Sequence, residues 1–164
     1  MELIISIFAI IISIVSIVVS VIIYYKGVER EQKQATLDAF NVLQEQVFDN
    51  LNQYKVSEIK NICLLWKQAI SKNRSKKELT EDEEKAIDEY RLLSGYLARI
   101  EHFALGVNTD IYDAKIAERA ATAYLVSLYR QKLKPLIELK HVGNKDIEYY
   151  AEFRKLVEKI EKIK

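Results

Sequence analysis

The chain has 164 residues, with 25 Lys and Arg, 24 Asp and Glu, and a formal net charge of +1. This length fits one domain with a modest core, and the charge balance argues against a nucleic-acid-binding face, which needs excess positive charge on one side. One Pro and four Gly leave little material for a turn-rich β fold, whereas abundant Ala, Leu, Glu, Lys, Gln and Arg favour helix. The sequence therefore predicts an all-α protein that binds no nucleic acid.

The first segment, residues 3–25, contains no charged side chain. As a helix it would span about 34 Å, enough to cross a hydrocarbon core of roughly 30 Å. A cleaved signal peptide is the alternative. It is disfavoured because Glu2 replaces a basic N-terminal region, the apolar run is too long, and no small-x-small cleavage site follows. We expect one transmembrane helix in the lipid bilayer.

The flanks of this segment predict its orientation. Lys26, Arg30 and Lys33 follow it closely, whereas no Lys or Arg precedes it. Positive residues stay on the cytoplasmic side, and the two tyrosines that end the segment suit an interfacial position. We therefore expect a single-pass protein of the cell inner (plasma) membrane, with residues 26–164 forming a cytoplasmic antiparallel helical bundle.

Small residues inside the predicted span recur at steps of three and four, which places them on one stripe of a helix. They are Ser6, Ala9, Ser13, Ser16 and Ser20. Such a stripe permits close backbone approach and interhelical hydrogen bonds. It predicts a homo-oligomer that associates through the span, against the alternative that the serines share one face by chance.

After Gly27, apolar residues recur among charged ones and predict an amphipathic helix over roughly 28–71. This helix either continues from the span or flexes at Gly27, and Ser57 either caps a new segment or lies within it. The next residues, 72–79, break the pattern and indicate a solvated loop. The predicted apolar face comprises Leu37, Phe40, Leu43, Val47, Leu51 and Tyr54.

A sharper signal follows, because Thr80 and Glu83 have the spacing of a capping box. We expect a helix over 81–105 that Gly106 ends. One of Asn108, Thr109 and Asp110 is expected to cap the next helix, over 111–134, which Pro135 interrupts.

The C-terminal part is predicted to contain a short helix over 136–142, a turn at Gly143-Asn144 and a last helix over 147–163 capped by Asp146. The last helix has a heptad-like apolar seam, which packing on the domain or on a partner explains equally well. The seam residues are Tyr149, Phe153, Leu156, Ile160 and Ile163.

Motifs for common enzyme chemistry are missing from the sequence. There is no phosphate-cradling glycine-rich loop, no GxSxG elbow and no cysteine cluster for zinc. A di-iron centre needs two ExxH pairs, and only Glu138 to His141 matches. The single cysteine, Cys63, lies among apolar residues and is expected in the core. We therefore expect no cofactor, no metal and no catalytic residues.

The most unusual polar pair is Glu101 and His102, because Glu101 falls beside the apolar stripe of its helix. A carboxylate there is expected to be buried or at the edge of a cleft. The favoured interpretation is an ion pair or hydrogen bond to Arg99, Arg119 or a tyrosine hydroxyl, and the alternative is an acid/base role.

The segment 96–137 combines several features. They are Glu101 in an aliphatic helix, Ala104 and Gly106 ending it, Tyr112 and Asp113 opening the next, and Tyr129 before Lys134 and Pro135. In these features the segment resembles a family of bacterial proteins called domain of unknown function 4760. The resemblance implies a short membrane anchor followed by a helical cytoplasmic region, and it implies no reaction or substrate.

Three hypotheses for the function follow. The first is a non-enzymatic, membrane-tethered helical scaffold that presents a cytoplasmic surface to a protein partner, as a homo-oligomer. The second is a membrane-disrupting effector in stress or phage defence, whose spans cluster into a pore. The third, and last in rank, is an enzyme that uses Glu101 in a helical cleft.

Overall fold

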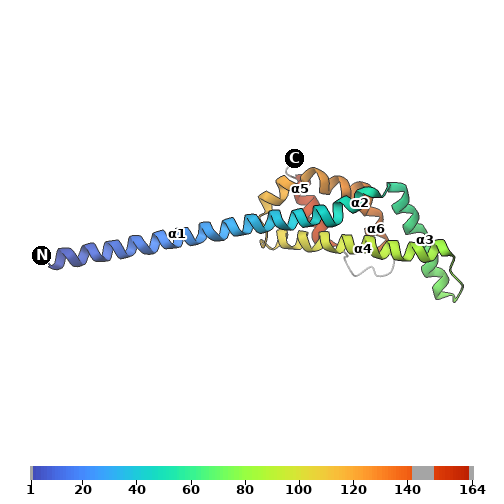
Figure 1. The fold of residues 1–164 in the computed structure, drawn as a ribbon, viewed down its shortest axis with the longest axis horizontal. Helices are drawn as coiled ribbons and strands as arrows, with labels where there is room; N and C mark the ends of the chain where they lie inside the picture. Colours follow the sequence, from blue (N-terminus) through green and yellow to red (C-terminus); the bar gives the residue numbers. More distant parts are fainter. Residues whose placement is uncertain (1, 142–149, 163–164) are drawn as a thin grey trace.

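The computed structural model of the chain describes residues 2–141 and 150–162, apart from the side chains of residues 2–7, 9, 121–123 and 139–141. Within these ranges every regular element is helical, so the all-α prediction is confirmed (Figure 1). Two of the elements, η1 and η2, are π-helical turns. In chain order the elements are α1 (Glu2–Leu43), η1 (Gln44–Phe48), α2 (Asp49–Gln53), α3 (Val56–Arg74), α4 (Glu81–Asn108), α5 (Ala114–Leu128), η2 (Tyr129–Leu133), α6 (Lys134–His141) and α7 (Ala151–Lys162).

Helix α1 continues from the apolar segment into the domain without a break at Gly27, as one of the two alternatives predicted. An 18-residue stretch of its apolar part has a mean hydropathy of 2.2, and none of that stretch is buried in the structure. Figure 1 shows this part extending alone from the packed helices. By length and composition it has the properties of a helix that crosses a membrane.

Of the two alternatives for residues 28–71, the structure has a new helix near Ser57 rather than one continuous helix. After η1 and the short α2, the backbone becomes extended at Tyr54 and Lys55, with ψ angles of 130° and 153°. Glu58 caps the new helix α3, since its carboxylate accepts a hydrogen bond from the Lys55 N–H at 2.6 Å. Ser57 is therefore not the cap. At the end of α2, the Lys132 side chain donates a hydrogen bond to the Leu51 carbonyl at 2.8 Å.

The predicted start of α4 is confirmed. The Glu83 N–H donates to the Thr80 hydroxyl at 3.3 Å, and the Thr80 N–H donates to the Glu83 carboxylate at 2.8 Å. Lys72, from the predicted solvated loop, instead belongs to the last turn of α3 and pairs with buried Glu83 at 2.7 Å. The hydrogen bond from Lys72 is the main reason that the pKa of Glu83 lies below its ordinary value.

The predicted end of this helix at Gly106 is wrong, because α4 runs on to Asn108. Gly106 is buried inside the helix, where its missing Cβ admits another side chain: a Cβ there would lie 2.5 Å from ring atoms of Tyr112. The next helix is capped by Asp113, whose carboxylate accepts from the Ile116 N–H at 3.0 Å. The predicted caps Asn108, Thr109 and Asp110 all precede it.

Pro135 does not interrupt the helix that contains it. Residues 128–134 keep right-handed helical angles through η2 into α6. In η2 the Lys134 N–H donates to the Tyr129 carbonyl, five residues back. We infer that this wider turn accommodates the proline, which lacks an N–H and crowds the preceding turn of a regular α-helix.

Helix α7 packs on the domain through its apolar seam, mainly against α4 and α5. Phe153, Leu156 and Ile160 are buried, and the Phe153 ring meets Tyr129 edge to face at 5.5 Å. The predicted Gly143-Asn144 turn, the Asp146 cap, and Tyr149 and Ile163 of the seam lie outside the described residues. Packing on the domain is therefore the interpretation that holds for the described part of the seam.

The core joins all these helices. Cys63 is buried in it, as predicted, and burial raises the pKa of its thiol to about 11, so the thiol stays protonated at neutral pH.

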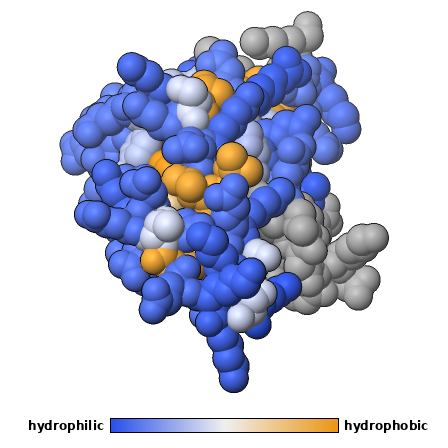
Figure 2. Space-filling model, turned by 90° about the vertical axis from the view of Figure 1, so that its right-hand side faces the viewer, coloured by the Kyte–Doolittle hydropathy of each residue, from blue (hydrophilic) through white to orange (hydrophobic). Residues whose placement is uncertain are grey.

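Leu37, predicted on the apolar face of α1, is instead 40% exposed. Figure 2 shows the end of the domain farthest from the N-terminus as mostly hydrophilic, with a small hydrophobic group at its centre. The largest fully buried side chains include Leu51, Ile59, Leu93, Leu97, Ile100, Leu125, Leu133, Phe153 and Ile160.

Candidate functional site

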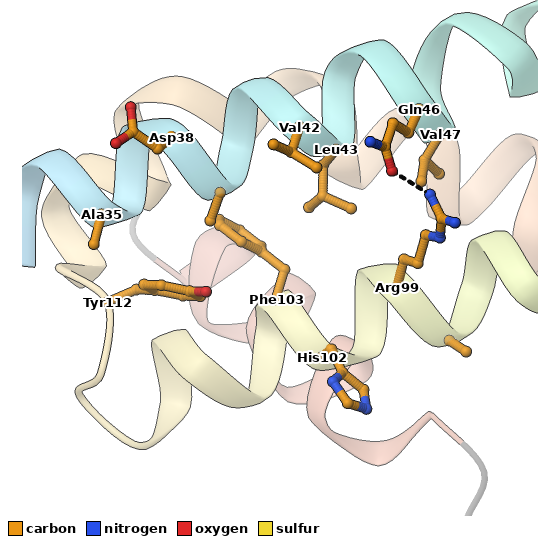
Figure 3. A pocket seen from close by; sticks show the side chains of 12 residues that line it. Ala35, Asp38, Val42, Leu43, Gln46, Val47, Arg99, His102, Phe103 and Tyr112 are labelled. Atoms are coloured by element: carbon orange, nitrogen blue, oxygen red, sulfur yellow. Dashed lines mark hydrogen bonds between the residues drawn. The ribbon is translucent and has the colours of Figure 1, made fainter.

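A groove of about 820 Å³ lies between α1 and α4 (Figure 3). One wall is the second half of α1 with η1, the other is α4, and the α4–α5 turn closes one end. Cavities of this size hold a small ligand or the anchoring side chains of a docked segment. The groove is lined by Ala35, Asp38, Ala39, Val42, Leu43, Gln46, Val47, Ala98, Arg99, His102, Phe103 and Tyr112.

Large and small residues together leave the groove open. The Phe40 and Phe103 rings lie 6.2 Å apart between the two walls and hold the helices apart. Short side chains then line the space on either side, namely Ala35 and Ala39 on α1 and Ala98 on α4. Helices separated by aromatic rings and lined with alanine cannot fill the gap with their own atoms. The interior of the groove is therefore apolar.

The end wall of the groove is an aromatic pair. The Tyr112 ring stacks on Phe103 with 5.5 Å between ring centroids. The ring also occupies the position at which any larger residue at 106 would place its Cβ. The Tyr112 N–H donates to the Gly106 carbonyl at 2.9 Å, which holds the turn against the helix. Gly106 is thus required for this close approach rather than for ending the helix.

Polar side chains surround the apolar interior. Asp38 lies on the α1 side and accepts a hydrogen bond from Gln34 at 2.9 Å. Arg99 and His102 lie on the α4 side, and the Arg99 guanidinium donates to Gln46 across the groove (Figure 3). An occupant would therefore meet an anionic group on one rim and cationic or neutral donors on the other.

The structure separates Glu101 from His102. His102 is exposed and faces the groove, whereas Glu101 lies under α7. Both Glu101 carboxylate oxygens accept backbone hydrogen bonds, from the Glu152 N–H at 3.0 Å and the Phe153 N–H at 2.8 Å. A carboxylate in this position satisfies unpaired N–H groups and the dipole of the first turn of a helix.

Glu101 is thus hydrogen-bonded, as the favoured interpretation expected, but its partners here are backbone N–H groups rather than Arg99, Arg119 or a tyrosine hydroxyl. Arg99 bonds to Gln46, and Arg119 is exposed on α5. The groups that donate to the Glu101 carboxylate lie at the N-terminus of α7, about fifty residues further along the chain. Asn108 adds to this junction by donating to the Glu152 carbonyl at 3.0 Å and to its carboxylate at 2.9 Å.

The serine stripe lies on the free part of α1. Ser13, Ser16 and Ser20 are exposed, and the Ser20 hydroxyl donates to the Ser16 carbonyl at 2.8 Å. Ser6 and Ala9 have side chains outside the described part. At 100° per residue the three serines point roughly 140° to 200° away from Thr36, which is buried against the domain. The stripe therefore lies on the side of α1 opposite the domain.

Metal-ligating side chains do not gather in the part of the chain that the structure describes: no group of three His, Cys, Asp or Glu is placed to share an ion. The side chain of His141, from the predicted ExxH pair, lies outside that part. The groove itself was missed by the sequence analysis. Its signal was the presence of alanines on two amphipathic helices, which becomes informative only when the two helices are known to face each other.

These features define a class of protein: a helical domain carried on one long, exposed, apolar helix. The chain belongs to the family described as Domain of unknown function (DUF4760), whose model matches residues 3–160. The match confirms the resemblance seen in residues 96–137 and extends it over the apolar helix and the whole domain. The chain matches no curated protein and no solved structure.

Proposed function

We propose that the chain is a non-enzymatic scaffold tethered to the inner (plasma) membrane, and that its groove holds an amphipathic helix of a cytoplasmic protein partner. The observation that carries this proposal is the continuity of α1. Its first half is apolar and exposed, and its second half forms a wall of the groove. One continuous helix thus joins the proposed membrane anchor to the proposed docking surface.

Two observations support the anchor. The apolar stretch is unburied, which a soluble chain does not tolerate over such a length. The family model also covers this helix together with the domain, which favours a permanent anchor over a removed signal peptide. Lys26, Arg30 and Lys33 after the span favour a cytoplasmic domain.

The groove suits an amphipathic helix. A helix that docks in a groove places apolar side chains at steps of three and four into an apolar interior, and its polar flanks meet the rim. The alanines and Phe103 supply the interior, while Asp38 and Arg99 supply charges on opposite rims. Glu101, the candidate base of the enzymatic alternative, has both oxygens engaged by backbone N–H groups.

A photo-crosslinking residue at Val42, which is 50% exposed in the groove, should capture the partner in intact membranes. The additional substitution Ala98→Trp fills the opposite wall and should reduce that crosslink about tenfold, which corresponds to a loss of about 1.4 kcal/mol in binding. The yield of crosslinked product, measured by mass spectrometry and blotting, tests this.

Leu64 provides the matched control, because it is 54% exposed and lies on α3, outside the groove. The same crosslinker there should not capture the same protein. Equal capture from both positions, or capture at Val42 that Ala98→Trp leaves unchanged, would show that the groove is not the docking site.

Self-association of the span is the second part of the proposal. The exposed serines on the side of α1 opposite the domain let two spans approach without a clash between the domains they carry. The double substitution Ser13→Leu and Ser16→Leu should weaken association about tenfold, because the larger side chains keep the backbones apart. Energy transfer between labelled chains in lipid vesicles measures this.

Substitution of Ile14 and Ile17 by Leu is the control for the serine variant, since neither residue belongs to the stripe. If the serine and isoleucine variants associate equally well, the stripe is not the interface. Dye release from vesicles by the natural chain that the serine variant abolishes would instead favour the membrane-disrupting effector.

A further inference from the structure

The turn between α4 and α5 presents an apolar side chain to solvent. Ile111 at its tip is 64% exposed, and the preceding residue, Asp110, has a positive φ of 58°. This left-handed conformation is uncommon outside glycine, although Asp adopts it more readily than most residues. A constrained backbone therefore holds an isoleucine outward, away from the core.

Helix α1 fixes the position of this turn. The Gln32 side-chain amide donates to the Asp110 carbonyl at 2.5 Å, and the Asp113 N–H donates to the Thr36 hydroxyl at 2.8 Å. Thr36 is buried at this junction. Two hydrogen bonds, one on each side of Ile111, thus attach the turn to adjacent turns of α1.

The same helix sets the distance of the turn from the membrane. Gln32 follows Tyr25, the last residue of the proposed span, by seven residues, which is about 10 Å along the axis. The headgroup layer extends about 5 to 8 Å beyond the hydrocarbon core, and a typical helix tilt of about 20° lowers one side of the domain further. Figure 1 shows the turn at the end of the domain from which the apolar part of α1 emerges.

The charges at this level are nearly balanced. Lys33 pairs with Glu29 at 2.5 Å and is the main reason that the pKa of that carboxyl is lowered, while the nearby charges of Asp113 and Lys115 act on it in opposite directions. Asp110 and Asp113 in the turn offset the cations nearby. Contact with a membrane here would therefore depend on apolar insertion, and zwitterionic lipid is sufficient to test it.

We propose that Ile111 inserts into the interfacial layer of the bilayer that α1 crosses. The inference rests on the proposed function, because it requires residues 3–25 to span that bilayer. The domain would then touch the membrane at two places, the span and the turn. Two contacts fix the rotation of the domain about α1, and therefore the direction in which the groove opens.

Quenching of tryptophan by brominated phosphatidylcholine tests this in the full chain reconstituted into vesicles. The natural tryptophan is removed by Trp66→Phe, and Ile111→Trp supplies the probe. A tryptophan in the interfacial layer should lose about half of its fluorescence and shift its emission to shorter wavelength. Leu92→Trp is the control, since Leu92 is 47% exposed on α4 and lies about 21 Å along that helix from Gly106.

Three outcomes are distinguishable when sedimentation and alkaline extraction of the vesicles accompany the quenching. Quenching at position 111 and not at position 92, in chains that resist extraction, supports the inference. Chains that resist extraction but show no quenching at position 111 overturn it and leave the span intact. Chains that alkali extracts contradict the proposed membrane anchor itself, and the inference fails with it.

Discussion

Glu101→Ala should destabilise the domain by about 3 kcal/mol, because two backbone N–H groups at the start of α7 lose a charged acceptor. Helix α7 should then separate from α4 at lower denaturant concentration than the rest of the domain unfolds. Chemical denaturation followed by circular dichroism measures the first effect. Hydrogen exchange at the Glu152 and Phe153 amides measures the second.

Two neighbouring substitutions serve as controls for Glu101. Glu101→Gln keeps one amide oxygen as an acceptor and should cost roughly half as much. His102→Ala changes an exposed residue of the groove and should alter stability by less than about 0.5 kcal/mol. A Glu101→Ala protein as stable as the natural chain would show that the carboxylate does not hold α7.

Gly106→Ala should destabilise the domain by about 2 kcal/mol, although alanine favours helix over glycine by about 1 kcal/mol. The new Cβ would lie 2.5 Å from the Tyr112 ring, which is held between Gly106 and Phe103 and cannot move without losing its stacking. Overpacking of this kind costs about 1 to 3 kcal/mol and should exceed the gain in helix propensity. The midpoint of thermal unfolding provides the measurement.

Gly95 offers a matched control on the same helix, because a Cβ there meets no atom within 4 Å. Gly95→Ala should therefore stabilise the domain by up to about 1 kcal/mol, a change of opposite sign. If both substitutions raise the unfolding temperature, Tyr112 does not need the space at Gly106.

Local signals in the sequence predicted what local contacts determine. The capping box at Thr80 and Glu83 depends on residues three positions apart, so the start of α4 was predictable. The continuity of α1 was one of two alternatives, because Gly27 permits a bend without requiring one. Burial of Cys63 followed from its apolar neighbours in the sequence.

Local rules failed where distant contacts decide the outcome. Pro135 should have ended a helix, but η2 widens the preceding turn, and α5 and η2 are held by the ring contact of Tyr129 with Phe153 of α7. Gly106 was predicted to end the helix, because the Tyr112 ring that needs the space at Gly106 belongs to the following turn and is not evident from the sequence of the helix. The polar pattern around Glu101 indicated burial but could not identify a partner about fifty residues away.

Because α1 is uninterrupted, it also fixes the angle about its axis between its apolar part and the groove. One residue inserted between Gly27 and Gln32 would turn the groove by about 100° around the helix axis and raise it by about 1.5 Å. Seven inserted residues would return it to within about 20° of its original bearing, at a greater height. The number of residues in this short stretch therefore sets the direction in which the groove faces. Insertions close to a whole number of helical turns preserve that direction, and other insertions change it.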